Sequence, residues 1–210
     1  MKLIDLLERA RNYPVFDLED CRKWFPRGSR ATTILQLSNF AKDGKITRVR
    51  RGLYLLPGTE GLHPFVIASR IDPESCISLE SVLAQAGIIP ETMFGAVAIT
   101  TGKTRQFTIQ NYGSVRFRHE KPSLNFGWSV VRMGQYAVRV ASTEKALLDL
   151  LWFHRFEADL AGYVHELRLT IPKTFSWTLF KRYCKLYEGH QMDILAEQVI
   201  NIHHDHTKTV

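Results

Sequence analysis

The chain has 210 residues, of which 45% are hydrophobic and 23% are charged, and its formal net charge is +7. This length and composition support a sizeable hydrophobic core and argue against wholesale disorder. No segment approaches the roughly 20 continuous apolar residues of a membrane helix, and the first residues lack the apolar centre and cleavage site of a secretory signal.

The three cysteines, Cys21, Cys76 and Cys184, are far apart and form no C-x-x-C pair. Neither a disulfide framework nor a zinc site is expected from such spacing. We therefore expect a cytoplasmic protein with reduced thiols and no membrane partner.

The positive charge is concentrated near the N-terminus. Residues 21–51 contain nine Lys or Arg side chains but a single acidic side chain, Asp43. A charge focused in this way is typical of proteins that bind a polyanion. A solvated basic surface is the alternative, and composition alone does not decide between the two.

Three helices are predicted in the first part of the chain. Residues 2–11 place apolar side chains at helical spacing. Asp17 is a suitable N-cap for a second helix, which Pro26 ends. After a tight turn, Ser29 is the expected N-cap of a third helix that runs to about Asp43.

The third predicted helix has an apolar side, made of Ala31, Ile34, Leu37 and Ala41 and flanked by Leu35 and Phe40. Its other side carries short hydrogen-bonding groups rather than the Glu–Lys pairs of a solvated helix: Arg30, Thr32, Thr33, Gln36, Asn39 and Asp43. Amide and guanidinium groups can read base edges in the major groove of DNA. The pattern therefore predicts a DNA-reading helix.

Residues 45–56 place β-branched and apolar residues on both sides of Arg51-Gly52, which predicts a hairpin. Three helices followed by a basic hairpin is the order of a winged helix-turn-helix. The predicted DNA-binding residues are Arg27, Ser29, Arg30, Thr32, Thr33, Gln36, Asn39, Lys45, Arg48, Arg50 and Arg51. Those of the third helix are expected to contact bases, and those of the hairpin to contact the backbone. A protein-docking unit with exposed polar residues is the alternative.

A Pro-Gly-Thr-Glu-Gly linker at residues 57–61 predicts a DNA-binding domain over residues 1–58 and a second domain over residues 62–210. In the second domain, five short strands between residues 95 and 140 are joined by tight turns, which suggests a mainly antiparallel sheet. Helices precede and follow these strands. The predicted fold class is therefore α+β: a winged helix-turn-helix followed by an α+β domain with C-terminal helices.

Two patterns in the second domain suggest chemistry, but each has a better interpretation. Ser142-Thr-Glu-Lys145 matches the S-x-x-K nucleophile motif, yet it stands at the start of an apolar helix without companion motifs, so a helix cap is expected. The run from His203 to His206 could bind a metal, but four adjacent residues cannot all point at one ion. We therefore predict no catalytic residue, no metal, no cofactor and no enzymatic activity.

A second basic group consists of Lys103, Arg105, Arg116 and Arg118, with Lys121 nearby. On adjacent strands, the three arginines could converge on one face and contact nucleic acid or an acidic partner. An ordinary exposed sheet face is the alternative.

Three segments resemble the abortive-infection AbiE-type antitoxins. Residues 77–91 (ISLESVLAQAGIIPE) are similar to the family's I-S-L-E-S-A-L-x-x-x-G-L-I-P-E segment. Residues 98–105 (AITTGKTR) resemble its T-T-x-K-T-R strand, and residues 141–151 (ASTEKALLDLL) resemble its A-x-P-E-K-A-L-L-D-L-L helix. The resemblance covers most of the chain to about residue 155.

The resemblance implies a transcriptional repressor that is the antitoxin of a type IV toxin-antitoxin system. Such a protein represses its own operon through an N-terminal winged helix and counters a nucleotidyltransferase-like toxin through its C-terminal domain. The expected partners are double-stranded promoter DNA and, with or without direct contact, that toxin. Two alternatives stay open: a nucleic-acid-acting enzyme with a winged-helix targeting arm, and a protein-interaction module without DNA activity.

Overall fold

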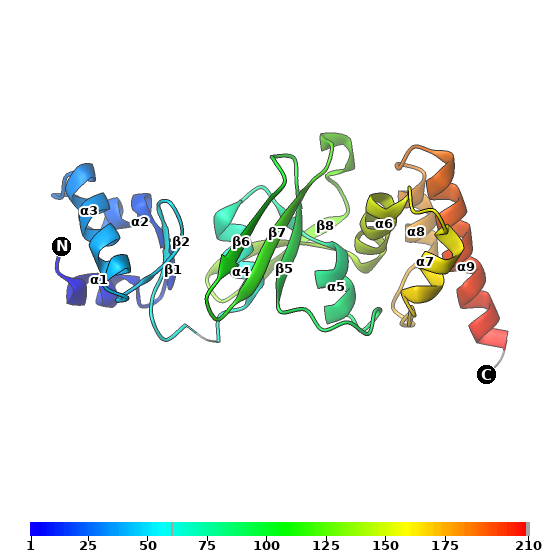
Figure 1. Ribbon diagram of the computed structural model, residues 1–210, viewed down its shortest axis with the longest axis horizontal. Helices are drawn as coiled ribbons and strands as arrows, with labels where there is room; N and C mark the ends of the chain where they lie inside the picture. The colour runs from blue at the N-terminus through cyan, green and yellow to red at the C-terminus, as the bar shows by residue number, and fades with distance from the viewer. Residues whose placement is uncertain (60, 209–210) are drawn as a thin grey trace.

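The computed structural model describes residues 1–59 and 61–208, with side chains described as far as residue 203. Its elements follow one another along the longest axis in approximate chain order (Figure 1). Small N-terminal helices lie at one end, a large sheet lies in the middle, and the C-terminal helices lie at the other end. The architecture is mixed α and β, which agrees with the predicted α+β class.

The N-terminal unit contains three helices and a three-stranded sheet. Its elements are α1 (Leu3–Ala10), β1 (Val15–Asp17), α2 (Leu18–Trp24), α3 (Arg30–Lys42), β2 (Thr47–Arg50) and β3 (Leu53–Leu55). The sheet has the order β1-β3-β2, and both pairings are antiparallel. Asp17 caps α2 by accepting from Glu19 N and Asp20 N, and Ser29 caps α3 by accepting from Thr32 N, so both predicted helix starts are confirmed.

The two faces of this small sheet belong to different cores, because successive side chains of a strand point to opposite faces. Phe16, Tyr54 and Leu56 pack with the N-terminal helices. The other face packs into the main core together with α4 and the large sheet, and it contributes Val15, Val49, Leu53 and Leu55. The hydrophobic core therefore continues across the predicted linker at residues 57–61.

Polar contacts also join the N-terminal unit to the rest of the chain. The hydroxyl of Tyr136 accepts a hydrogen bond from Val15 N (3.0 Å) and donates one to Val15 O (3.2 Å). The guanidinium of Arg70 forms ion pairs with Asp17 (3.2 Å) and Asp20 (2.5 Å) at the start of α2. These contacts fix the N-terminal unit against the second unit, residues 61–208.

The large sheet has six strands in the order β6-β7-β5-β4-β9-β8. The strands are β4 (Cys76–Ile77), β5 (Gly95–Thr100), β6 (Arg105–Ile109), β7 (Gly113–His119), β8 (Trp128–Met133) and β9 (Tyr136–Ala141). Three neighbouring pairs are antiparallel, whereas β5–β7 and β4–β9 are parallel. Most pairings in this sheet are thus antiparallel, as predicted, but its two parallel pairings make the sheet mixed. The tight turns make β6–β7 and β8–β9 antiparallel, but β6 goes to the edge of the sheet and β7 returns beside β5, parallel to it.

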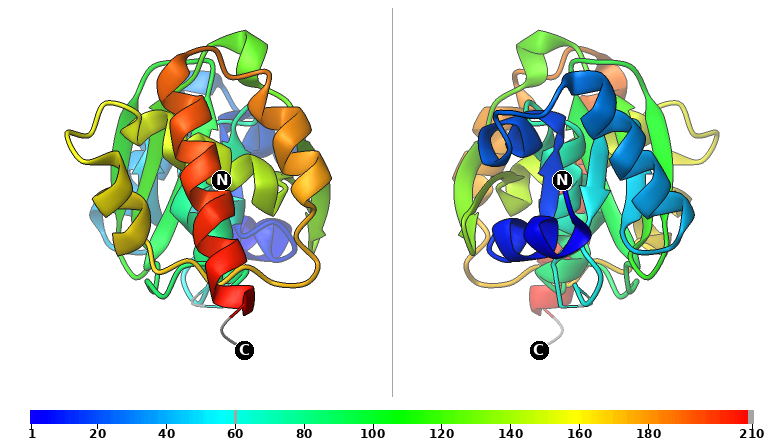
Figure 2. Two further views of the ribbon diagram at one scale, coloured as in Figure 1. Left: turned by 90° about the vertical axis from the view of Figure 1, so that its right-hand side faces the viewer. Right: turned by 90° about the vertical axis from the view of Figure 1, so that its left-hand side faces the viewer.

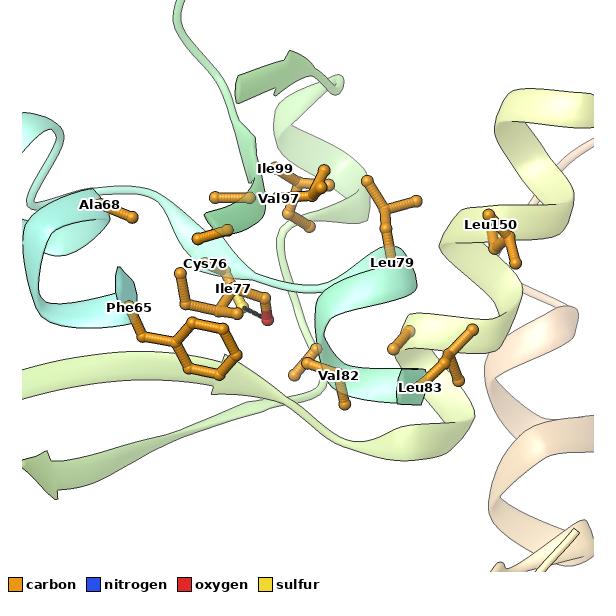
Figure 3. Packing of buried hydrophobic residues seen from close by; sticks show 14 of the residues in the cluster. Phe65, Ala68, Cys76, Ile77, Leu79, Val82, Leu83, Val97, Ile99 and Leu150 are labelled. Carbon is orange, nitrogen blue, oxygen red and sulfur yellow. Dashed lines mark hydrogen bonds between the residues drawn. The ribbon is translucent and has the colours of Figure 1, made fainter. Parts of the chain in front are cut away.

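Helices cover this sheet and form the C-terminal end. They are α4 (Pro64–Ile71), α5 (Leu79–Gln85), the 3-10 turn η1 (Pro122–Leu124), α6 (Thr143–His154), α7 (Leu160–Glu166), α8 (Trp177–Cys184) and α9 (His190–Lys208). Figure 3 shows Phe65 of α4 on one side of Ile77 and Leu83 of α5 on the other, facing Leu150 of α6. The long helix α9 crosses the C-terminal end between α7 and α8 (Figure 2, left).

Candidate nucleic-acid interface

The buried stripe of α3 is centred on Thr33 and Leu37, whose exposed fractions are 5% and 0%. Gln36, Phe40 and Ala41 are half-buried beside them. This spacing is that of one helix face. The solvent-facing side of α3 carries Ala31, Thr32, Ile34, Leu35, Ser38, Asn39 and Lys42.

The observed orientation of α3 differs from the predicted one in two ways: some residues of the predicted apolar side are exposed, and some of the predicted DNA-reading side are buried or half-buried. Ile34 and Leu35 are 40% and 62% exposed, although the sequence placed them on or beside the apolar side. Thr33 donates its hydroxyl proton to Ser29 O (3.0 Å), and Gln36 Oε1 accepts from the backbone nitrogen of Met1 (3.1 Å). Thr33 is therefore bonded within the start of its own helix, and Gln36 ties the inner side of α3 to the N-terminus. The apolar residues of α3 are spread around the whole helix, so its sequence does not define one apolar face. The elements that pack against α3 therefore decide which face is buried.

The other predicted residues of α3 and its preceding turn are accessible. Arg27, Arg30 and Asn39 are exposed. Ser29 and Thr32 are also exposed, but their hydroxyl groups lie 2.8 Å apart and form part of the helix cap.

Sequence reasoning missed two polar side chains on the same exposed face, Ser38 and Lys42. Together with Leu35 and Asn39 they have the spacing i, i+3, i+4, i+7, which puts them on one line along the helix. Taking Leu37, Phe40 and Ala41 as the buried stripe would have revealed this line. It combines an amide, a hydroxyl and a cation with one apolar side chain suited to a thymine methyl group.

The hairpin of β2 and β3 turns at Arg51-Gly52, where Gly52 has a φ of +82° that favours glycine. Lys45, Arg48 and Arg51 are exposed, and within the described part of the chain none of them forms an ion pair. These cations are therefore available to a polyanion.

Arg50 lies apart from the other cations of the hairpin. An irregularity of β2 between Arg48 and Arg50 places Arg50 opposite Leu53, on the face that packs against the second unit. Its guanidinium donates to the backbone oxygens of Arg51 (3.1 Å) and of Ile71 at the end of α4 (3.4 Å). The structure thus gives Arg50 a part in holding the hairpin against the second unit.

The second basic group lies next to the hairpin, because β2 contacts β6. Its three arginines do not converge on one face as the sequence suggested. In the register of β6 and β7, Arg105 lies opposite Phe117, whereas Arg116 lies opposite Gln106 and therefore points to the other face. Arg105 is paired with Asp72 (2.5 Å), and Arg118 stacks on Phe153 (4.6 Å). Lys103 and Arg116 remain exposed.

Internal ion pairs neutralise little of the charge in residues 21–51. Among the nine cations of this segment, Arg22 alone forms an ion pair with a described residue, Glu19 (3.1 Å). The other eight contribute their full charge to the surface potential around α3 and the hairpin, which attracts an anionic partner.

A buried charged cluster in the second unit is a different candidate site. The ammonium group of Lys145 contacts Asp149 Oδ1 and lies 3.3 Å from Glu120 Oε2. Ser78 and Tyr187 each donate a hydroxyl proton to Asp149 at 2.5 Å. Lys145 and Asp149 are 0% exposed and Glu120 is 3% exposed, so a substrate has no access to the cluster.

The S-x-x-K motif does not form a nucleophilic pair. Ser142 Oγ accepts from Lys145 N (3.3 Å) at the start of α6, which confirms the predicted helix cap. The side chain of Lys145 contacts Glu120 and Asp149 instead of Ser142. The motif therefore starts a helix and supplies the cation of the buried cluster.

The pKa of Glu120 is raised to about 8, and burial is the largest cause. The neighbouring Asp149 carboxylate also raises this pKa, and Lys145 lowers it by less. This pKa lies above the ordinary value of 4.5. Glu120 is then mainly protonated at neutral pH, and one cation faces one carboxylate. The buried cluster is electroneutral in that state, which reduces the cost of burying it.

We expect the stability of the chain to fall as the pH rises from 5 to 8. A group whose pKa is raised in the folded state contributes stability below its unfolded pKa and loses that contribution as pH rises through the folded pKa. A pKa that differs by one between the folded and unfolded states corresponds to about 1.4 kcal/mol of unfolding free energy. Urea denaturation at several pH values should show this fall, and Glu120→Gln should flatten it. Parallel pH profiles for the two proteins would contradict the raised pKa.

Within the described residues, no group of three or more His, Cys, Asp or Glu side chains is arranged to hold a metal ion. The histidine-rich run is only partly covered: His203 packs against Trp177, with ring centres 4.8 Å apart, while the side chains of residues 204–206 lie outside the described residues. None of the described helices combines the length and apolar character needed to span a membrane.

Comparison with known proteins does not assign the chain to a family. No protein-family model matches it, and no curated protein is significantly similar to it. The resemblance to AbiE-type antitoxins stays a prediction from the quoted segments.

Proposed function

We propose that this chain binds double-stranded DNA through a winged helix-turn-helix in its N-terminal unit. α2 and α3 form the helix-turn-helix, α3 enters the major groove, and the β2–β3 hairpin is the wing. One observation carries this proposal: a helix with an exposed hydrogen-bonding face is followed by a hairpin whose exposed cations have no internal ion pairs among the described residues.

The burial pattern supports a division of roles among the residues. The amide of Asn39 is suited to adenine, and Leu35 is suited to a thymine methyl group. Lys42, Lys45, Arg48 and Arg51 would contact phosphates, which position the protein without reading sequence. Gln36 and the exposed Arg50 act as positioning residues, since they bond α3 to the N-terminus and the hairpin to the end of α4. Thr33 is buried and bonded within α3.

We expect Asn39→Ala to weaken binding to the upstream promoter about 5- to 150-fold, which corresponds to about 1–3 kcal/mol for one bidentate base contact. Binding to a scrambled duplex of equal length should hardly change. Arg48→Ala should instead weaken both duplexes and reduce the salt slope by about one. Fluorescence anisotropy with both duplexes at two salt concentrations measures these effects. If both variants affect the two duplexes equally, the division of roles is wrong.

We further propose that the chain acts in the cytoplasm as an autoregulating repressor and as the antitoxin of a type IV system. The resemblance of residues 77–91, 98–105 and 141–151 to AbiE-type antitoxins supports this part. Expression of the chain in cells whose growth is arrested by a nucleotidyltransferase-like toxin of such a system should restore growth, and a fusion of the chain's own promoter to a reporter should be repressed. Repression without rescue would leave a solitary regulator.

A protein-docking role is the second candidate, because Ile34 and Leu35 expose apolar surface on α3. In that case the chain would show no binding to the promoter even at low salt. The affinity for a partner protein bound mainly through these apolar side chains would not fall as the salt concentration rises.

A further inference from the structure

A pocket of about 440 Å³ lies between α2 and α3. This volume falls within the roughly 300–1,000 Å³ of small-molecule sites. The end of α2, the following turn and the first two turns of α3 form its walls, with Met1 at one side: Met1, Trp24, Phe25, Pro26, Arg27, Gly28, Thr32, Thr33 and Gln36. The interior of this pocket has no part in the proposed DNA-binding function, although Arg27 and Thr32 at its wall are candidate DNA contacts.

The pocket combines aromatic walls with a few polar groups. Trp24 packs against Phe16 (ring centres 5.8 Å apart) and Tyr13 (6.4 Å), so its indole is held in position. Trp24 and Phe25 offer flat apolar surface to a planar ring. Gln36 also lines the pocket; its amide nitrogen makes no hydrogen bond to the described residues, while Gln36 Oε1 accepts from the N-terminus. A donor is therefore free on the polar wall.

The charge at the pocket is positive. Arg27 forms no ion pair within the described part of the chain. The carboxylates of α2 and its cap are already engaged, because Glu19 pairs with Arg22 and both Asp17 and Asp20 pair with Arg70. An anionic group on a ligand would therefore meet Arg27 without a competing carboxylate from α2.

We propose that this pocket binds a small aromatic carboxylate. The ring packs against Trp24 and Phe25, and the carboxylate accepts hydrogen bonds from Arg27 and from the amide of Gln36. A guanidinium–carboxylate contact is charge-assisted and directional, so it selects the acid over an uncharged molecule of the same shape.

If the proposed function is correct, the ligand and DNA would compete for the same side chains. Thr32 lines the pocket and also lies on the exposed face of α3, and Arg27 is a candidate DNA contact. A carboxylate at Arg27 would repel a phosphate and neutralise the cation that attracts it. Such a ligand would release the protein from its promoter.

The test compares 2-naphthoate with the uncharged 2-naphthylmethanol by NMR titration of the ¹⁵N-labelled full chain. We expect both to shift the indole resonance of Trp24, and 2-naphthoate to bind about tenfold more tightly. Arg27→Gln should abolish that preference, whereas the matched control Arg22→Gln should retain it, because Arg22 is paired with Glu19 and lies outside the pocket. Equal affinities in the unmodified protein, or shifts confined to residues outside the pocket, would overturn the proposal.

Competition is measured separately, by adding 2-naphthoate to the protein–promoter complex in an anisotropy assay. The NMR titration contains no DNA, so its result does not depend on the proposed function. Failure of the promoter to bind at all would refute the DNA-binding function. Absence of the naphthoate preference in the NMR titration would refute the pocket.

Discussion

Replacing Lys145 with Met is expected to lower the free energy of unfolding by about 3–5 kcal/mol. Lys145 is the cation of the buried cluster, and Glu120 and Asp149 are its two carboxyl partners. Its ammonium group also lies 5.0 Å and 5.2 Å from the ring centres of Phe126 and Tyr187. Methionine fills a similar volume but carries no charge, so the Asp149 carboxylate stays buried with only its hydroxyl donors.

Urea denaturation at pH 7 measures this loss. Lys181→Met is the matched control, because Lys181 is exposed on α8 without an ion pair to a described residue, and its change should stay within about 0.5 kcal/mol. The triple change Glu120→Gln, Lys145→Met and Asp149→Leu should recover part of the loss, since replacing all the ionisable groups of a buried cluster costs less than leaving one charge unpaired. A Lys145→Met variant as stable as the Lys181→Met control would show that the cluster contributes no stability.

The start of α6 could be predicted from the sequence, whereas most of the buried cluster could not. A cap at Ser142 and the apolar run after it are local signals. Lys145 and Asp149 interrupt that run at i and i+4, which indicates a buried pair. Their partners Ser78 and Tyr187 lie 71 and 38 residues from Asp149 along the chain, and no local pattern brings them together.

The candidate interface shows the same limit. The caps of α2 and α3 could be predicted because each depends on a side chain within three residues. The orientation of α3 could not, because it depends on Leu37 packing in one cluster with Leu6 of α1 and Cys21 of α2. Residues 15–17 form a strand because β3, far along the chain, pairs with them, and no local pattern predicts that pairing.

A fragment of residues 1–58 is not expected to fold on its own, although it matches the predicted DNA-binding domain. It would expose four side chains that the second unit covers: Val15, Val49, Leu53 and Leu55. Burial of each contributes about 1.5–3 kcal/mol, or roughly 6–12 kcal/mol together. That loss is comparable to the total stability of an ordinary domain, about 5–15 kcal/mol. The fragment also lacks Arg70 and Tyr136, which hold α2 and β1.

Thermal denaturation followed by circular dichroism should show a cooperative transition for the full chain and none for the fragment. Leu53→Thr gives the sharper comparison, because the side chain is buried in one protein and exposed in the other. Leu53→Thr should lower the free energy of unfolding of the full chain by several kcal/mol, as truncations of buried leucine do. The same change should leave the circular dichroism of the fragment unchanged, or make the fragment more soluble. A cooperative transition of the fragment alone would mean that the small sheet is stable without the second unit. Without such a transition, the second unit is part of the core that positions α3, and a change that disturbs this shared core also disturbs the support of α3.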